Sequence, residues 1–121
     1  MRCAGGHGDA GAGADRCWMR ALSNELQQAL KDCNESISIK GDVANTLDSR
    51  AMVYLKLGRL DEAIADYDAA LKLSPRFSTS LYGRGVAKEK KGDTAGAEAD
   101  KAAAKAIRSN IEKEFADYGV N

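Results

Sequence analysis

The sequence predicts an all-α protein built from pairs of antiparallel helices. One observation is compositional, because the chain holds a single proline and almost lacks the β-branched runs that are typical of strands. A second is periodic: between residues 60 and 71 the apolar side chains recur at i, i+3, i+4 and i+7, on one face of a helix. The third is repetition, because many positions agree after a shift of 34 residues.

The elements follow in order along the chain. Residues 1–15, rich in glycine and alanine, are expected to form a flexible tail. From Arg16 helix formers dominate, Pro75 closes the helix that begins near residue 60, and an alanine-rich helix is expected over 94–107. Residues that tolerate a left-handed conformation are expected to end the first helix of each pair: Asn24, Gly58 and Gly92.

An arginine and an aspartate recur together in each 34-residue unit. The members of each pair are 16 residues apart, so they reach similar heights on two antiparallel helices, and we expect a ladder of arginine–carboxylate bonds that fixes the register of the helices. The alternative is that each group is only solvated. The predicted pairs are Arg16–Asp32, Arg50–Asp66 and Arg84–Asp100.

The spacing of small and aromatic residues within 44–77 resembles the tetratricopeptide repeat, a 34-residue helix-turn-helix unit. The residues that carry the resemblance are Leu47, Ala51, Tyr54, Gly58, Ala63, Tyr67, Ala70 and Pro75. Residues 78–111 fit more loosely, because Lys88 and Lys101 stand where aromatic residues are usual. The resemblance implies a right-handed α-solenoid of about two and a half repeats (16–43 partial, 44–77 and 78–111) within a domain of residues 16–121.

The segment after the repeats predicts a capping helix over about 108–118. Ile107, Ile111, Phe115 and Tyr118 fall at i, i+4, i+8 and i+11, with charged residues on the opposite side. A solenoid needs a terminal element with one apolar and one polar face. The N-terminal end has no comparable cover, which leaves a face for a partner or for a homodimer.

The bulk properties restrict the classes of function. The chain has 121 residues, enough for one domain, and its 18 lysines and arginines balance 18 aspartates and glutamates. Nucleic-acid and membrane-surface proteins usually carry excess positive charge, and no apolar run approaches the length of a membrane span. The first 15 residues lack the apolar core of a signal peptide, so the sequence predicts a cytoplasmic protein.

The cysteines and the single histidine bear on catalysis and metal binding. The odd number of cysteines predicts reduced thiols, with Cys17 and Cys33 buried as small apolar side chains. Cys3, His7, Asp9 and Cys17 could be drawn together around zinc, but their spacing matches no tight motif. Since His7 lies in the glycine-rich tail, we expect no enzyme, no metal site and no cofactor.

The resemblance implies that the first helix of each repeat lines a concave groove that binds a peptide or helix of another protein. Side chains that the helix pairs do not need would line it: Trp18, Asn45, Asp48, Met52, Leu55, Lys56, Tyr82, Val86 and Glu89. The alternative is that these residues pack against neighbouring helices. The basic clamp by which some family members hold acidic C-termini is missing at the corresponding places.

Two other functions are weighed against groove binding. One is a structural, self-associating module that dimerises through the uncovered N-terminal face. The other is nucleic-acid binding, since residues 78–113 carry eight basic and five acidic side chains; without interleaved aromatic residues it is the weaker alternative.

Overall fold

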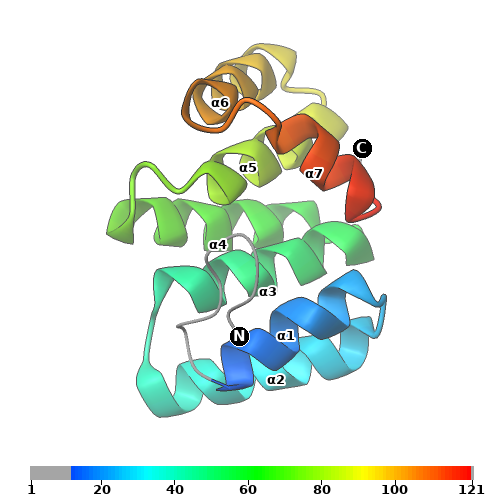
Figure 1. Cartoon of the computed structure of the whole chain (residues 1–121), viewed down its shortest axis with the longest axis vertical. Helices are drawn as coiled ribbons and strands as arrows, with labels where there is room; N and C mark the ends of the chain where they lie inside the picture. Colours follow the sequence, from blue (N-terminus) through cyan, green and yellow to red (C-terminus); the bar gives the residue numbers. More distant parts are fainter. Residues whose placement is uncertain (1–11, 121) are drawn as a thin grey trace.

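The computed structural model describes residues 12–120, which form seven helices and no strand (Figure 1). The helices are α1 (Ala12–Leu22), α2 (Leu26–Lys40), α3 (Ala44–Leu57), α4 (Leu60–Leu73), α5 (Ser78–Lys90), α6 (Thr94–Ile107) and α7 (Ile111–Asp117). The first six form three antiparallel pairs that stack in chain order along the long axis of the molecule (Figure 1). The prediction of an all-α solenoid of helix pairs is therefore confirmed.

Left-handed residues terminate the first helix of each pair. Asn24, Gly58 and Gly92 have φ angles of 62°, 80° and 94°, which asparagine and glycine adopt most readily. The next helix starts within two residues of each, so the chain reverses tightly and the pair packs antiparallel. The N-terminal boundary differs from the expected one, because α1 begins at Ala12 rather than Arg16; residues 1–11 of the expected tail lie outside the described part of the chain.

The three pairs form two layers. Helix α3 contacts both α1 and α5, whereas within residues 12–120 α2, α4 and α6 contact only the helices next to them in the chain. Because the helices of the first layer contact one another in succession and those of the second do not, the surface formed by α1, α3 and α5 is the concave face of the stack.

Small residues set the distance between the helices. Ala51, Ala63 and Ala97 are at most 1% exposed, as close helix crossings require. Tyr67 is also completely buried, and it fills a space left by Gly83 on the next helix. A Cβ atom at Gly83 would lie 2.3 Å from the Cζ atom of Tyr67, so α4 and α5 meet at a position where glycine is needed.

A disulfide between Cys17 and Cys33 joins α1 to α2, and the prediction of free thiols is wrong for this pair. By the 34-residue register these cysteines stand where the next repeat has Ala51 and Tyr67. Cys33 is too small to fill a tyrosine site, and the bonded sulfur atoms occupy the interior there with both residues fully buried. Disulfides are rare in the cytosol, so this bond gives no support to the cytoplasmic location, which stays a prediction.

Two of the three expected arginine–aspartate pairs form bidentate contacts. Arg50 donates to both carboxylate oxygens of Asp66 at 2.7 and 2.9 Å, and Arg84 does so to Asp100 at 2.8 and 2.9 Å. Each arginine also reaches the preceding repeat. The partners there lie 16 residues earlier: Asn34 for Arg50 at 2.9 Å and Asp68 for Arg84 at 2.8 Å. The pairs thus lie within a repeat and also link it to its neighbour.

The first repeat departs from this arrangement. Arg16 approaches Asp32 only to 3.8 Å, while Arg20 donates to Asp32 at 2.9 Å. Position 20 corresponds to position 88 by the register of the repeats, and Lys88 likewise lies 3.1 Å from Asp100. The basic residues in place of an aromatic side chain therefore have a structural role: they supply a second cation to the buried aspartate.

Candidate functional site

Helix α7 packs on the last helix pair and lies along the concave face. It packs on α5 and the end of α6 and runs back across the stack toward α3 (Figure 1). Ile111 and Phe115 are completely buried and Val120 is 5% exposed. The helix expected over 108–118 thus exists as Ile111–Asp117. It packs on the last helix pair, and its rings also reach across the groove to Trp18 on α1.

Aromatic rings connect α7 to the groove. The Phe115 ring lies 4.7 Å from Tyr82 on α5, measured between ring centroids, and 5.5 Å from Tyr118. Tyr118 in turn meets Trp18 on α1 edge to face at 5.2 Å. Such tilted and edge-to-face contacts are favourable beyond the area that they bury. The four rings form a continuous line from α5 across the groove to α1.

Six of the nine predicted groove residues are buried beneath α7 or in the adjoining core. They are Trp18, Asp48, Met52, Leu55, Tyr82 and Val86, each at most 5% exposed. Asn45 and Lys56 are half-buried, and Glu89 is exposed and bonded to Lys101. The expectation of an open apolar surface is therefore corrected: the residues do gather on one face, but this chain's own C-terminal segment occupies it.

Polar groups complete the groove floor. The Asp48 carboxylate accepts hydrogen bonds from the hydroxyl groups of Thr79 at 3.1 Å and Ser80 at 2.6 Å, which ties α3 to α5. Lys56 donates to the Ala21 carbonyl at 2.9 Å and so connects α3 to α1. Burial lowers the pKa of the Lys56 ammonium. These bonds hold the three lining helices in fixed positions.

The two ends of the groove remain open and are basic. A hollow of about 460 Å³ at one end is lined by Asn45, Phe77 and Ile107 together with Arg76 and Arg108. A second hollow of about 200 Å³ lies beside Val120 at the other end, and its lining includes the lysines Lys56 and Lys90. The groove therefore has an apolar, occupied centre and positively charged ends.

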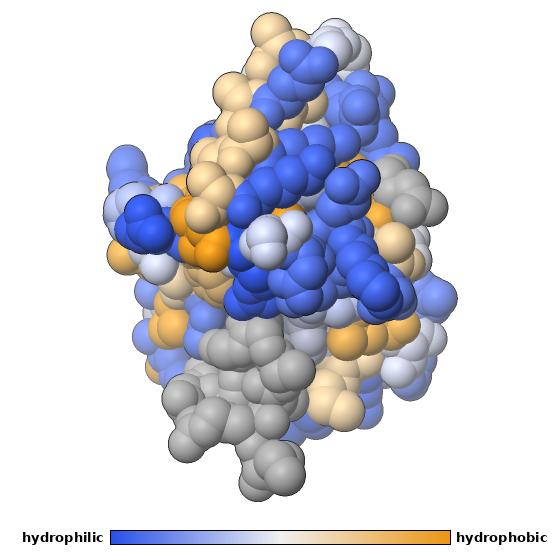
Figure 2. Space-filling view, turned by 45° about the horizontal axis from the view of Figure 1, so that its top comes forward, coloured by the Kyte–Doolittle hydropathy of each residue, from blue (hydrophilic) through white to orange (hydrophobic). Residues whose placement is uncertain are grey.

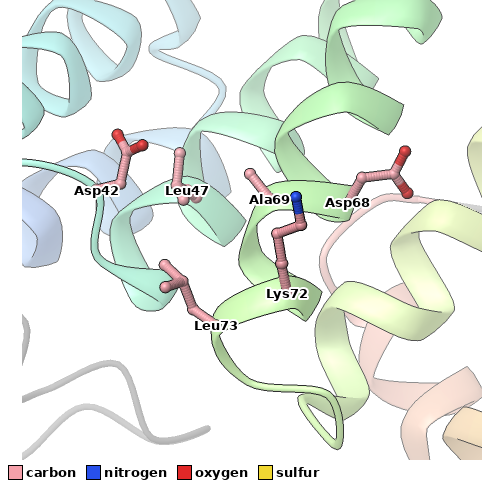
Figure 3. A pocket seen from close by; sticks show the side chains of 6 residues that line it. All are labelled: Asp42, Leu47, Asp68, Ala69, Lys72 and Leu73. Atoms are coloured by element: carbon pink, nitrogen blue, oxygen red, sulfur yellow. The ribbon is translucent and has the colours of Figure 1, made fainter.

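A further hollow lies away from the groove, between the start of α3 and the end of α4 (Figure 3). It measures about 420 Å³, and Asp42 and Asp68 stand at opposite sides of it. The remaining lining is Leu47, Ala69, Lys72 and Leu73. Two carboxylates, one ammonium group and aliphatic side chains suit a surface contact better than proton or acyl transfer. Among the described residues no group of histidine, cysteine and carboxylate side chains could hold a metal ion.

Most of the basic residues between 78 and 113 are paired with carboxylates. Seven of the eight are involved: Arg84, Lys88, Lys91, Lys101, Lys105, Arg108 and Lys113. Figure 2 accordingly shows a mixed hydrophilic surface, with a paler apolar strip along the alanine-rich α6. Paired charges do not form the basic stripe that tracks a nucleic-acid backbone.

The sequence contains a signal for the helix that occupies the groove. Ile111, Phe115 and Tyr118 have the spacing of an amphipathic helix, which indicates an apolar face without saying what that face covers. The complementary signal was an aromatic residue on α1, Trp18, whose ring meets that of Tyr118. None of the helices between residues 12 and 120 is long and apolar enough to cross a membrane.

Comparisons with known proteins agree with this architecture. A family model described as TPR repeat matches residues 51–92. The photosystem I assembly protein Ycf3 of Synechococcus sp. (strain WH7803) is 34% identical over an alignment of 74 residues, and the match covers 59% of this chain and 43% of that protein. The crystal structure of a tetratricopeptide repeat protein from Parabacteroides merdae ATCC 43184 superposes with a TM-score of 0.64 at 21% identity, over 87% of this chain and 48% of the other.

This chain thus spans less than half the length of each of these two proteins. The repeat spacing, the stacked helix pairs and the matching family model nevertheless agree on one repeat type. Residues 51–92 thus match the tetratricopeptide repeat model, and the stacked helix pairs have the fold of a tetratricopeptide repeat protein.

Proposed function

We propose that this chain is a non-catalytic module that binds a segment of another protein in the concave groove formed by α1, α3 and α5. One observation carries the proposal: the groove already holds a helix, α7, through the buried side chains of Ile111 and Phe115. A surface that binds one amphipathic helix has the shape and the apolar chemistry to bind another. Tetratricopeptide repeat proteins generally mediate contacts between proteins, which fits this reading.

The rigidity of the groove supports this function. The Cys17–Cys33 disulfide ties α1 to α2, and the pairs of Arg50 and Arg84 link successive repeats. A binding surface that is held in place before the partner arrives loses less conformational entropy on binding. Flat or mobile surfaces without such links bind more weakly for the same area.

The relative named as a photosystem I assembly protein fits a binding function of this kind. A rigid helical groove can hold a segment of another protein without chemical change, which is compatible with an assembly role. Because the similarity covers 43% of that relative, we extend to this chain only the general role of holding a protein segment.

A site-specific photo-crosslinker tests the proposal. Placed at Asn45, in the open hollow at the groove end, it should attach a distinct partner protein in extracts of the source cells. A matched crosslinker at Lys31, exposed on the outer layer, is the control and should not attach that protein. Adducts from Lys31 but none from Asn45 would place the binding surface on the outer layer and refute groove binding.

Self-association stays an alternative function. The first helix pair exposes Met19 and Ile39, with 57% and 75% of their surfaces accessible. These apolar side chains could form a contact between two copies of the chain. Size-exclusion chromatography with light scattering decides it: a dimer whose mass does not change on dilution favours self-association, and a monomer opposes it.

A further inference from the structure

We infer that the partner segment is an acidic amphipathic helix with the side-chain spacing of α7, and that it binds by displacing α7 from the groove. This inference rests on the proposed function and deepens it by naming the chemistry of the partner. Three features of the described residues carry it: the pattern of buried side chains on α7, the charge of the groove ends, and the apolar packing of α7 against α1, α3 and α5.

The side chains of α7 that pack into the groove are spaced four and then three residues apart. Ile111, Phe115 and Tyr118 lie on one side of the segment; the first two are fully buried and the third is half-buried against Trp18. Phe115 takes the central place beside Tyr82. A partner with aliphatic, aromatic and aromatic residues at these spacings would present the same side chains to the same sites.

The charges select an acidic helix. Three carboxylates and one lysine lie between residues 111 and 118, so this segment is net negative. The groove ends carry the opposite sign, with Arg76 and Arg108 at one end and Lys56 and Lys90 at the other. Arg108 already donates to the Glu114 carboxylate at 2.7 Å. Because Arg108 is the C-cap residue of α6 and precedes α7, we expect it to stay with α6 for an acidic residue of the partner when α7 leaves.

The attachment of α7 is suited to exchange. Its side-chain bonds to charged groups are all local: Lys105 to Glu112, Arg108 to Glu114, and Lys113 to Asp117. Toward α1, α3 and α5 its described contacts are ring contacts and apolar packing. A helix of seven residues has little stability by itself, so undocking costs mainly these apolar contacts. Any helix that supplies them can replace it.

A labelled peptide with the sequence of residues 108–120 is the probe for this exchange. Binding to the full chain is followed by fluorescence anisotropy, for the wild type and for Phe115→Ala, which weakens the docking of α7. In the wild type the tethered α7 competes at an effective concentration on the order of 1 mM. For an open groove that binds the peptide at about 10 μM, the wild type should therefore bind roughly 100-fold more weakly than the variant.

Matched controls separate docking from folding. Lys113→Ala changes an exposed position of the same helix and should leave the weak wild-type affinity unchanged. A peptide in which the phenylalanine is replaced by alanine should lose binding to the variant. Tyr118→Ala removes only the half-buried edge contact and provides a milder opening of the groove if Phe115→Ala loses helicity by circular dichroism.

Equal peptide affinity, within twofold, for the wild type and for a variant that keeps its helicity would overturn the inference. That result is distinct from failure of the proposed function. If the peptide does not bind but a protein still crosslinks at Asn45, the groove binds a partner of other chemistry. If the peptide binds the variant but no protein crosslinks at Asn45, the groove can exchange α7 for a similar helix, and it is the proposed binding of another protein that fails.

Discussion

Replacing Gly83 by alanine should destabilise the protein, because the added methyl group would overlap the buried ring of Tyr67. A Cβ atom there would lie 2.3 Å from both Cζ and Oη and 2.8 Å from Cε1 of the ring. Carbon atoms in contact are normally about 3.5–4.0 Å apart, so the ring or the helix must move. Tyr67 is completely buried, which leaves its ring no free space.

Two opposing effects set the magnitude. Alanine is a better helix former than glycine by about 1 kcal/mol, which favours the variant. Overpacking a core costs about 1–3 kcal/mol, and an overlap with three ring atoms belongs at the upper end of that range. We therefore expect Gly83→Ala to lower the free energy of unfolding by about 2 kcal/mol, measured by urea denaturation followed by circular dichroism.

A double-mutant cycle tests whether the ring is the cause. The Tyr67 hydroxyl makes no hydrogen bond with the described residues, so Tyr67→Phe alone should change stability little. In combination with Gly83→Ala it removes one of the two closest overlaps and should restore about 1 kcal/mol. A Gly83→Ala protein as stable as the wild type, or more stable, would refute this account of the α4–α5 contact.

Three further predictions concern the disulfide, the groove and the arginine pairs. Cys33→Ser removes the disulfide that closes a loop of 16 residues, so it should lower the free energy of unfolding by about 3 kcal/mol in urea titrations. Reductant should lower the free energy of unfolding of the wild type but not that of the variant. Burial, together with the Glu114 carboxylate, raises the pKa of Tyr118 to about 12. The unfolded phenol ionises near pH 10, so the neutral Tyr118 ring stabilises the folded state fully below pH 10, and this stabilisation is lost as the pH rises toward 12. Unfolding at high pH should shift the fluorescence emission of the single tryptophan to the red, and Tyr118→Phe should reduce that shift between pH 10 and 12. Arg50→Lys cannot match both oxygens of its carboxylate and should cost about 1–2 kcal/mol by thermal melting, whereas Arg59→Lys, an exposed pair, should change nothing measurable.

The sequence was sufficient for the local structure, because local structure depends on neighbouring residues. Helical periodicity and the residues at positions 24, 58 and 92 gave the helices and their turns. The 34-residue repetition predicted the stacking of pairs and placed Arg50 and Arg84 opposite their aspartates, since antiparallel geometry converts a fixed separation in sequence into proximity. The repeat pattern predicted a close Arg16–Asp32 pair that does not form, because Arg20 donates to Asp32 instead.

Tertiary packing alone decided the rest. The apolar side of residues 111–118 could have covered the end of the solenoid or the groove, because the hydrophobic effect has no direction; the position of Trp18 and Tyr82 opposite its rings placed it in the groove. The disulfide likewise required Cys17 and Cys33 to come within 5.3 Å between their Cα atoms, a distance that their separation in sequence does not fix. Residue periodicity therefore determined the helices and their apolar faces, and the three-dimensional stack determined which faces meet.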